Sequence, residues 1–413
     1  MHDFLVCLGR SGDARVMKVA IVHVGYMTRG GEDVCVENEY QALRTELRNV
    51  LLINPKNDPS LAAIENAILA PFQNRLMKKV ERQITDFHPD VLHVHNVFPT
   101  LSPRLFQFAV RQGIRTVLTL HNFRPLCLNG LFLTPKGETC ERCTGEHYQQ
   151  GIIRGCYRDS RLSSALMATH LWKASKEGWY DDVDLFIAPS IFLRNKFIAG
   201  GFLSDRIVFQ PHFQPNLPHI SPISGKGYVL FLGRLSIEKG LRWLIKAFQS
   251  PRYGLKLLIA GTGPMENEVR AAVNASIEFK GYVTGEKKDE LIQGADLLVI
   301  PSVFYENSPM TIVEANGWGV PVLVNDNGGL KNIARPGENG QMYLHNNEES
   351  FWKQVRLILD HPEQRQRSQD YARTHFSEKQ FLKQRLSLYE GLVANATQAR
   401  LRIDSQGIYN ASV

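Results

Sequence analysis

The most constraining feature of this sequence is a regular alternation between short apolar segments and longer segments with helical periodicity. Several short segments are apolar throughout instead of alternating with polar residues, as expected for strands covered on both faces. The predicted strands are 19–24, 50–53, 91–94, 116–120, 185–187, 207–209, 228–232, 255–259, 277–279, 297–300 and 321–324. The predicted helices between them include 36–47, 101–112, 241–248, 266–275 and 310–318. Strands that alternate with helices predict an α/β fold with parallel sheets.

Length and composition are those of a globular protein with more than one domain. The chain has 413 residues, enough for two or three domains, and 43% of them are hydrophobic. A net charge of +7 fits an anionic partner. Six cysteines are too few for a disulfide scaffold, and no apolar run reaches the length of a membrane span. We therefore expect a cytoplasmic protein.

A segment rich in proline and glycine, 211–226, divides the chain into two halves that both open on a strand and a glycine-bearing turn. Two doubly wound domains of this kind bind ligands in the cleft at the carboxyl ends of their strands. The predicted parts are a tail 1–16, a first domain 17–215 with a cysteine-bearing insertion at about 122–160, a second domain 216–376, a helix 377–395 that crosses back to the first domain, and a tail 396–413.

Two cations in the second domain indicate an anion site. Arg234 and Lys239 lie between a predicted strand and the start of helix 241–248. The backbone N–H groups at a helix N-terminus favour an anion, and two adjacent cations match a diphosphate. The alternative is a pair of solvated cations on a surface loop.

Two glutamates follow the strand 297–300 in the same domain. Glu306 lies in the loop, and Glu314 lies in the helix that begins near Pro309. Glu314 could accept hydrogen bonds from two ribose hydroxyls, as acidic residues do in nucleotide-binding folds. The backbone N–H groups expected to face sugar or phosphate oxygens belong to Asn307, Ser308, Met310 and Thr311. The alternative is a capped helix with an exposed glutamate.

Taken together, these motifs resemble those of the retaining, GT-B-fold glycosyltransferases of family 4 (glycosyl transferases group 1). The matching segments are GRLSIEKG at 233–240, AGTGP at 260–264, FKGYV at 279–283, ADLLVIPS at 295–302, ENSPMTIVEA at 306–315 and GVPV at 319–322. The resemblance implies a GT-B fold, in which two Rossmann-like domains face each other across a cleft. It also implies the transfer of a hexose from a nucleotide diphosphate sugar, and family frequency favours a UDP-sugar.

The resemblance also assigns roles to residues of this chain. It implies that Arg234 and Lys239 bind the donor diphosphate, that Glu306 contacts the donor sugar, and that Glu314 binds the ribose. Further donor-binding positions that it implies are Gly233, Gly263 and Val283, the last in the loop whose backbone reads the base. Asn307 stands where many members of the family have glycine, and Pro309 removes one backbone donor from the loop.

The first half of the chain carries matching features. Gly30 and Gly31 resemble the glycine loop that approaches the donor phosphate, where a missing Cβ permits close contact. His121, in TLHNFRP at 119–125, resembles the histidine that lies against the donor sugar. A structural hydrogen bond is the alternative for this histidine. Neighbouring polar residues expected on the acceptor side are His95, Asn96, Asn122 and Arg124.

Four cysteines follow the His121 loop with the spacing C-x12-C-x2-C-x12-C. They are Cys127, Cys140, Cys143 and Cys156. The central C-x2-C has the spacing of a zinc knuckle, and four thiolates satisfy tetrahedral zinc. A structural zinc ion is thus one interpretation, and four free thiols or a disulfide are the alternatives.

The predicted function is metal-independent transfer of a hexose, with retention, to a hydroxyl of a glycan, a lipid-linked molecule or a small molecule. A non-catalytic GT-B binding or scaffold protein and a sugar phosphorylase are the alternatives. No cofactor is expected for catalysis, and no pattern indicates nucleic acid binding. A basic amphipathic helix over 70–84 would allow peripheral contact with the inner face of the membrane, but a solvated outer face is the ordinary interpretation.

Overall fold

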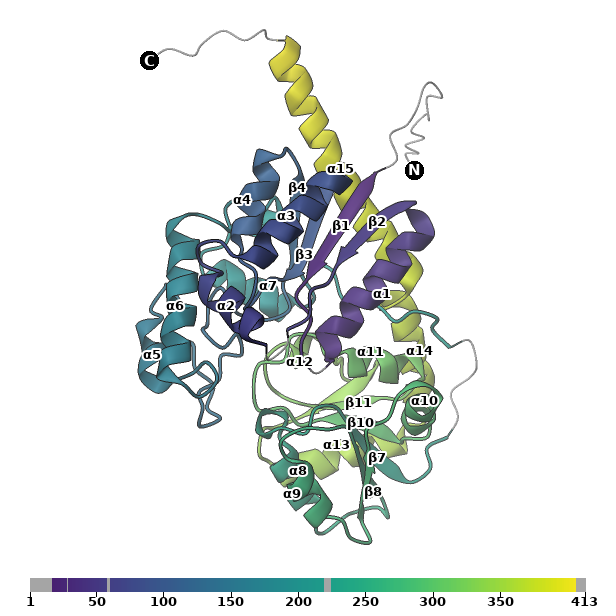
Figure 1. Cartoon of the computed structure of the whole chain (residues 1–413). Coiled ribbons are helices and arrows are strands. Elements are labelled where there is room, and N and C mark those ends of the chain that lie inside the picture. Colours follow the sequence, from purple (N-terminus) through teal and green to yellow (C-terminus); the bar gives the residue numbers. More distant parts are fainter. Residues whose placement is uncertain (1–16, 28, 58–59, 219–223, 406–413) are drawn as a thin grey trace, which may run out of the picture.

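The computed structural model describes residues 17–27, 29–57, 60–218 and 224–405. The predicted tail 1–16, the end of the second tail and five residues of the predicted linker lie outside the described residues. The chain forms two six-stranded parallel sheets, one from each half, with helices on both faces of each sheet (Figure 1). No helix in the described part of the chain is both long and apolar enough to cross a bilayer.

The first sheet has the strand order β2-β1-β3-β4-β5-β6, so the chain reverses its winding direction beside β1. Its strands are β1 (Lys18–His23), β2 (Asn49–Ile53), β3 (Val91–Asn96), β4 (Arg115–Thr119), β5 (Leu185–Ala188) and β6 (Ile207–Phe209). In β1, Val19 and Ile21 face one hydrophobic cluster, whereas Ala20 and Val22 face another on the opposite side of the sheet. Burial on both faces explains why the strands are apolar throughout, and each buried Val or Ile contributes roughly 1.5–3 kcal/mol.

The second sheet has the order β12-β11-β10-β7-β8-β9. Its strands are β7 (Tyr228–Leu232), β8 (Lys256–Ala260), β9 (Ile277–Gly281), β10 (Leu297–Ile300), β11 (Val322–Asn325) and β12 (Gly340–Tyr343). The sequence analysis missed β12, because it opens on Gly340 and has no β-branched residue. Gly340 is needed there, since a Cβ would lie 2.2 Å from the carbonyl oxygen of Val322 on the neighbouring strand.

The helices cover the sheets and connect successive strands. Those of the first domain are α1 (Gly31–Glu46), α2 (Leu61–Leu69), α3 (Arg75–Phe87), α4 (Arg104–Arg111), α5 (Gln149–Arg154), α6 (Arg161–Lys176) and α7 (Ile191–Ala199). Those after β7 are α8 (Leu241–Ala247), α9 (Glu266–Ala271), α10 (Gly285–Gln293), α11 (Met310–Gly317), α12 (Leu330–Ile333), α13 (Glu348–Asp360), α14 (Gln364–His375) and α15 (Glu378–Ser405).

The helix predicted over 70–84 was placed too early, because α3 begins at Arg75. The side chain of Asn74 caps this helix by accepting a hydrogen bond from the backbone N–H of Met77, at 2.7 Å. Asn74 also donates to the carbonyl oxygen of Thr100, which fixes the helix start against the next loop. The basic residues of α3 are exposed while Met77 and Val80 are buried, as in an outer helix with a solvated face.

Helix α15 leaves the second domain and runs along the first, with its end projecting beyond the body of the molecule (Figure 1). Phe381, Leu382 and Tyr389 pack in the same hydrophobic cluster as Val19 and Ile21 of the first sheet. The helix extends to Ser405, ten residues further than the predicted 377–395.

A buried polar network joins α15 to the first sheet. The guanidinium of Arg385, only 2% exposed, forms an ion pair with Glu39 of α1 and donates from Nε to Gln210 Oε1 at 2.8 Å. It also lies 3.1 Å from Nδ1 of His93 on β3, and the hydroxyl of Tyr389 lies 2.7 Å from that same nitrogen. The network anchors the last helix to β3, whose carboxyl end lies at the junction of the two domains.

Replacing Arg385 should destabilise the first domain strongly. Arg385→Leu would leave the Glu39 carboxylate buried without its cation, and breaking one side of a buried pair costs roughly 3–5 kcal/mol. We expect a loss of that size in the free energy of unfolding in urea. The control Lys383→Ala, at an exposed position of the same helix, should change it by about 0.5 kcal/mol or less. Equal effects of the two substitutions would contradict this account of the network.

Candidate active site

The carboxyl ends of the two sheets meet, and residues from both domains are in contact there. His121 follows β4 of the first sheet, and Asn307 follows β10 of the second. The side-chain amide of Asn307 donates a hydrogen bond of 2.6 Å to the backbone carbonyl of His121. The residue that replaces the usual glycine of the loop therefore joins the two domains directly.

Lys239 and Glu306 form an ion pair at this edge. Lys239 ends a short 3₁₀ helix (Ile237–Lys239), and its Nζ lies 2.6 Å from Oε1 of Glu306. Ser302 donates to the same oxygen at 2.6 Å, and Glu306 is 6% exposed. Gly240, at φ 73°, allows the loop to lie against β10, because a Cβ there would meet the carbonyl oxygen of Pro301 at 2.0 Å. Lys239 of the basic motif and Glu306 of the acidic motif are therefore in direct contact.

The adjacent glycines Gly328 and Gly329 support the loop that carries Glu306. The sequence analysis did not single them out. The N–H of Gly329 donates to the carbonyl of Glu306 at 2.8 Å, and a Cβ on Gly329 would meet that oxygen at 2.4 Å. Asn327 donates from its side chain to the carbonyl of Val303 at 3.0 Å. The signal in the sequence was the adjacent glycines 328 and 329, just after β11.

Arg234 lies one residue after Gly233 and is exposed. In the described part of the chain, no hydrogen bond or ion pair engages its guanidinium. Glycines pack the neighbouring turns together: a Cβ on Gly263 would lie 2.3 Å from the carbonyl oxygen of Leu235, and one on Gly261 would lie 1.8 Å from that of Gly233. The turn that presents Arg234 is therefore fixed, while the guanidinium remains available to a ligand.

Glu314 lies in α11, whose first residues follow Asn307 and Ser308. Its Oε1 lies 2.9 Å from Nζ of Lys288 on α10, and the side chain is 14% exposed. Burial raises the pKa of Glu314, and Lys288 opposes this shift. Val283 packs partly against the hydrophobic cluster on the same side of the sheet. Of the remaining loop residues, Ser308 and Thr311 are half-buried and Met310 is buried.

Gly30 and Gly31 lie where β1 leads into α1. The N–H of Gly30 donates to Oδ2 of Asp33 at 2.8 Å. A Cβ on Gly31 would meet no atom within 4 Å, so packing within the protein does not require glycine there. The open space at the start of this helix is consistent with close approach of a ligand.

His121 belongs to a row of histidines in which His95 is buried and His121 and His212 are half-buried. Its Nε2 lies 2.8 Å from Nδ1 of His95, and its ring stacks on that of His212 with centroids 5.5 Å apart. Burial lowers the pKa of His121 and of His95 well below the ordinary 6.5, so both imidazoles are neutral near pH 7. Glu39 Oε2 lies 3.7 Å from Nε2 of His95. A carboxylate on that side favours the proton on His95 Nε2, so that His121 donates from Nε2 and keeps Nδ1 as an acceptor.

The sequence analysis missed His93, His212, Glu39 and Arg385 in this region. The available signal was in β3, where His93 and His95 alternate within a strand that is otherwise apolar before Asn96. Among the described residues, Glu39, His93 and His95 form a set whose ligand atoms all lie within 4.8 Å of one another. The guanidinium of Arg385 already supplies a cation to Glu39 and His93, so this set is not a metal site in the present arrangement.

Three of the residues expected on the acceptor side form hydrogen bonds within the first domain. Asn96 donates to the carbonyl of Val24 at 3.1 Å, and Asn122 accepts from the N–H of Arg124 at 3.0 Å. Arg124 donates to the carbonyl of Leu128 at 3.1 Å. These contacts join the ends of β1 and β3 and shape the loop after β4, and contact with an acceptor stays a prediction.

Family models and solved structures identify the architecture. Residues 34–213 match the model for Glycosyltransferase Family 4, and residues 214–375 match that for Glycosyl transferases group 1. An uncharacterized glycosyltransferase of Methanocaldococcus jannaschii is 36% identical over 140 residues, which is 32% of this chain and 36% of that relative. The O-antigen chain mannosyltransferase B of Escherichia coli is 30% identical over 35% of this chain and 43% of that relative.

The alignments with these two relatives thus cover less than half of each relative's length. The structure of HepE from Anabaena in complex with UDP resembles the whole fold, with a TM-score of 0.62 and 17% identity over 91% of this chain and 100% of that one. Both halves of the chain match, in order and without a gap between them. The chain belongs to the GT-B-fold glycosyltransferases of family 4, with a group 1 domain as its second half.

Proposed function

We propose that the protein transfers a hexose from a nucleotide diphosphate sugar, first of all a UDP-sugar, to an acceptor hydroxyl with retention of anomeric configuration. The observation that carries the proposal is the Lys239–Glu306 pair, which lies at the carboxyl edge of the second sheet, beside the loop that contacts His121. Lys239, Glu306 and the neutral His121 thus all lie at the junction of the two domains. UDP in the structure of HepE supports uridine as the first base to test.

Departure of the nucleotide diphosphate is the step that the cations would accelerate. As the bond between the anomeric carbon and the diphosphate oxygen breaks, negative charge develops on the leaving phosphate. Arg234 and Lys239 would stabilise this charge in a preorganised site. The acceptor hydroxyl would attack from the same face, and its proton would pass to the departing phosphate oxygen. These two side chains supply the positive charge, so the proposal includes no catalytic metal.

Glu306 and His121 would position the donor sugar. In the present arrangement Lys239 neutralises Glu306, and a diphosphate would draw the ammonium toward itself. The Glu306 carboxylate, still held by Ser302, would then accept hydrogen bonds from sugar hydroxyls. The neutral His121, oriented by His95, would hydrogen-bond another hydroxyl. Glu314 would bind the ribose, and Lys288 would keep it ionised.

Domain motion is part of the proposed catalytic cycle. The hydrogen bond from Asn307 to His121 would break as the domains open for the donor. Reclosure over the donor would exclude water and limit donor hydrolysis.

The acceptor belongs to the same proposal. The relative that carries an O-antigen name favours a growing glycan, as a lipid-linked or free molecule. The exposed basic face of α3, with Arg75, Lys78, Lys79 and Arg82, would allow contact with the anionic inner face of the membrane. We therefore place the protein in the cytoplasm, at or near this surface.

Removing Arg234 should abolish most of the turnover without affecting the fold. Because its guanidinium has no partner in the described structure, Arg234→Ala leaves no buried group unpaired. We expect kcat/KM with a UDP-sugar to fall by about 10²–10³, the usual effect of losing one donor to a developing anion. Arg242→Ala is the matched control, since Arg242 is exposed nearby on α8 and forms an ion pair with Glu268. Turnover that survives the Arg234 change would overturn the assigned role, and no turnover from any donor in the wild type would favour a scaffold.

Donor binding should stabilise the protein in a base-dependent way. A ligand at 100 times its Kd adds about 2.7 kcal/mol of stability, which is visible as an upward shift of Tm. We expect UDP to give the largest shift among UDP, GDP and ADP, and Glu314→Gln to weaken the response. With 2′,3′-dideoxy-UDP, wild type and Glu314→Gln should respond alike, because the hydroxyls that Glu314 binds are absent. A difference that persists with the dideoxy nucleotide would remove Glu314 from the ribose site.

A further inference from the structure

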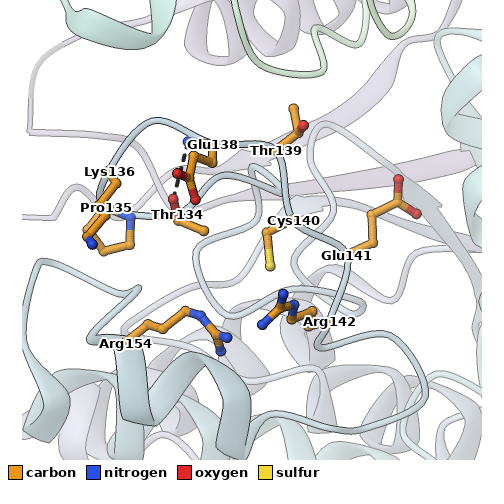
Figure 2. A pocket seen from close by; sticks show the side chains of 9 residues that line it. All are labelled: Thr134, Pro135, Lys136, Glu138, Thr139, Cys140, Glu141, Arg142 and Arg154. Carbon is orange, nitrogen blue, oxygen red and sulfur yellow. Dashed lines mark hydrogen bonds between the residues drawn. The ribbon is translucent and has the colours of Figure 1, made fainter.

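A pocket with a volume of about 510 Å³ lies in the segment between β4 and α6, and Figure 2 shows the side chains that line it. Its size falls within the range of roughly 300–1,000 Å³ that is usual for pockets that bind small ligands. Its walls are formed by residues between 134 and 142 and by Arg154, the last residue of α5. None of these residues belongs to the surface where Lys239 meets Glu306, so the pocket is a separate candidate site.

The same segment contains the four cysteines of the predicted zinc site. All four are free, and in the part of the chain that the structure describes no three of their sulfur atoms lie within 4.8 Å of one another. A zinc ion therefore stays a prediction for these cysteines. Cys140 is the one of them that lines the pocket.

One wall of the pocket is a closed turn. The N–H of Thr134 donates to the carbonyl of Glu138 at 2.8 Å, and the N–H of Gly137 donates to the carbonyl of Thr134 at 2.9 Å. The hydroxyl of Thr134 also accepts from the N–H of Glu138 at 3.2 Å (Figure 2). Gly137 has φ 83°, a left-handed conformation that glycine adopts without strain. This wall is thus formed before any ligand binds, which lowers the entropic cost of binding.

Positive charge is in excess at the pocket. Three cations line it, and among the described residues no hydrogen bond or ion pair engages the charged groups of Lys136 and Arg142. Of the two carboxylates in the lining, Glu141 is already paired, because its two oxygens lie 2.6 Å and 2.8 Å from Nζ of Lys196. The other carboxylate cannot balance three cations. A pocket of this kind attracts an anion.

Two guanidinium groups face this pocket. Figure 2 shows the ends of Arg142 and Arg154 directed toward one another. Nη1 of Arg154 donates to the backbone carbonyl and to Oε1 of Gln150, at 2.8 Å and 2.9 Å, which holds the side chain along α5. Its Nε and Nη2 make no hydrogen bond to any residue that the structure describes. A guanidinium can bind a carboxylate or a phosphate through two parallel hydrogen bonds, so these groups suit either anion.

The remainder of the lining is mostly polar. Thr134 and Thr139 contribute hydroxyls, and Glu138 contributes an exposed carboxylate. Sugar hydroxyls can form hydrogen bonds with groups of this kind, whereas an apolar ligand would leave them without partners. The lining therefore fits a sugar that carries a negative charge.

Contacts connect the pocket with the loop of Glu306. Nζ of Lys196, which is paired with Glu141 of the pocket, lies 5.4 Å from the ring centroid of Tyr305. Tyr305 belongs to the second domain and directly precedes Glu306. The pocket is therefore close to the junction of the domains, in the domain expected to hold the acceptor.

We propose that this pocket binds a sugar unit of the acceptor that carries a carboxylate or a phosphate group. Arg142 and Arg154 bind the anionic group, and Thr134, Thr139 and Glu138 bind hydroxyls of the same unit. The inference rests on the proposed function, because it assigns the pocket to the acceptor. No bond forms or breaks in the pocket; binding there positions another unit of the acceptor at the active site.

Binding of simple charged and neutral sugars to the full-length protein tests the proposal. The probes are D-glucuronate, D-glucose 6-phosphate, the neutral methyl α-D-glucoside and inorganic phosphate, each titrated and followed by ligand-observed NMR. We expect at least one of the two anionic sugars to bind ~10-fold more tightly than methyl α-D-glucoside, as for the gain of a hydrogen bond to a charged group. The preferred anion then distinguishes an acidic sugar from a phosphorylated one.

Arg142→Ala should weaken binding of the anionic sugar by ~10-fold. The side chain is exposed and unpaired in the described structure, so its removal should leave the fold unchanged. Lys136→Ala, at another exposed position of the lining, is the second variant and should also weaken binding. Arg111→Ala is the matched control: it removes the same charge from an exposed position of α4, outside the pocket, and should leave the affinity unchanged.

Equal binding of the charged and neutral sugars would overturn the proposal. So would an unchanged affinity in Arg142→Ala, or displacement of the sugar by UDP, which would place it in the donor site. If phosphate groups alone bind, and inorganic phosphate binds as tightly as glucose 6-phosphate, the pocket holds an anion and not a sugar. The Tm shift with UDP tests the proposed donor site separately, so failure of this inference and failure of the proposed function can be told apart.

Discussion

The ion pair between Lys239 and Glu306 is the interaction on which the site depends. It joins a lysine after β7 to a glutamate after β10, two strands that are neighbours in the sheet although 67 residues separate the side chains in sequence. A nearly buried pair of this kind adds little to stability, because desolvation offsets much of the attraction. In the proposed function its value is positional: it holds the Lys239 ammonium next to the Glu306 carboxylate, where an anionic ligand would separate them.

The rest of the architecture holds this pair opposite the first domain. Parallel strands buried on both faces bring every loop at their carboxyl ends to one edge. Helix α15 returns from the second domain and inserts Arg385 beside Glu39 and His93, while His95 lies between Glu39 and His121. The same helix therefore fastens the domains together and helps to orient the imidazole at their junction.

The family and the fold class could be predicted from sequence, and the comparisons confirm both. The strands could be predicted because burial on both faces produces local apolar runs. The motifs with Arg234 and Lys239, and with Glu306 and Glu314, could be found because the two residues of each motif lie close together in sequence. The Glu39–Arg385 pair could not be predicted from sequence, because its partners are 346 residues apart. In the sequence, each resembles an ordinary surface charge on a helix. Strand β12 was missed because the close approach of Gly340 to Val322, which its backbone requires, leaves no periodic pattern in the sequence. The start of α3 was misplaced because the side-chain cap by Asn74, which sets it, leaves none either.

The central claim is that Lys239 and Arg234 bind the second phosphate of the donor. Calorimetric binding of UDP and UMP to the wild type and to Lys239→Met tests it most directly, because the ratio of the two affinities isolates the contribution of that phosphate. The account predicts that wild type binds UDP at least ~10-fold more tightly than UMP, since a charge-assisted hydrogen bond contributes about 1.5–3 kcal/mol. Lys239→Met should lose most of this preference, and its affinity for UMP should change little. An unchanged ratio would mean that the ammonium does not contact the diphosphate, and the assignment of the site would then be wrong.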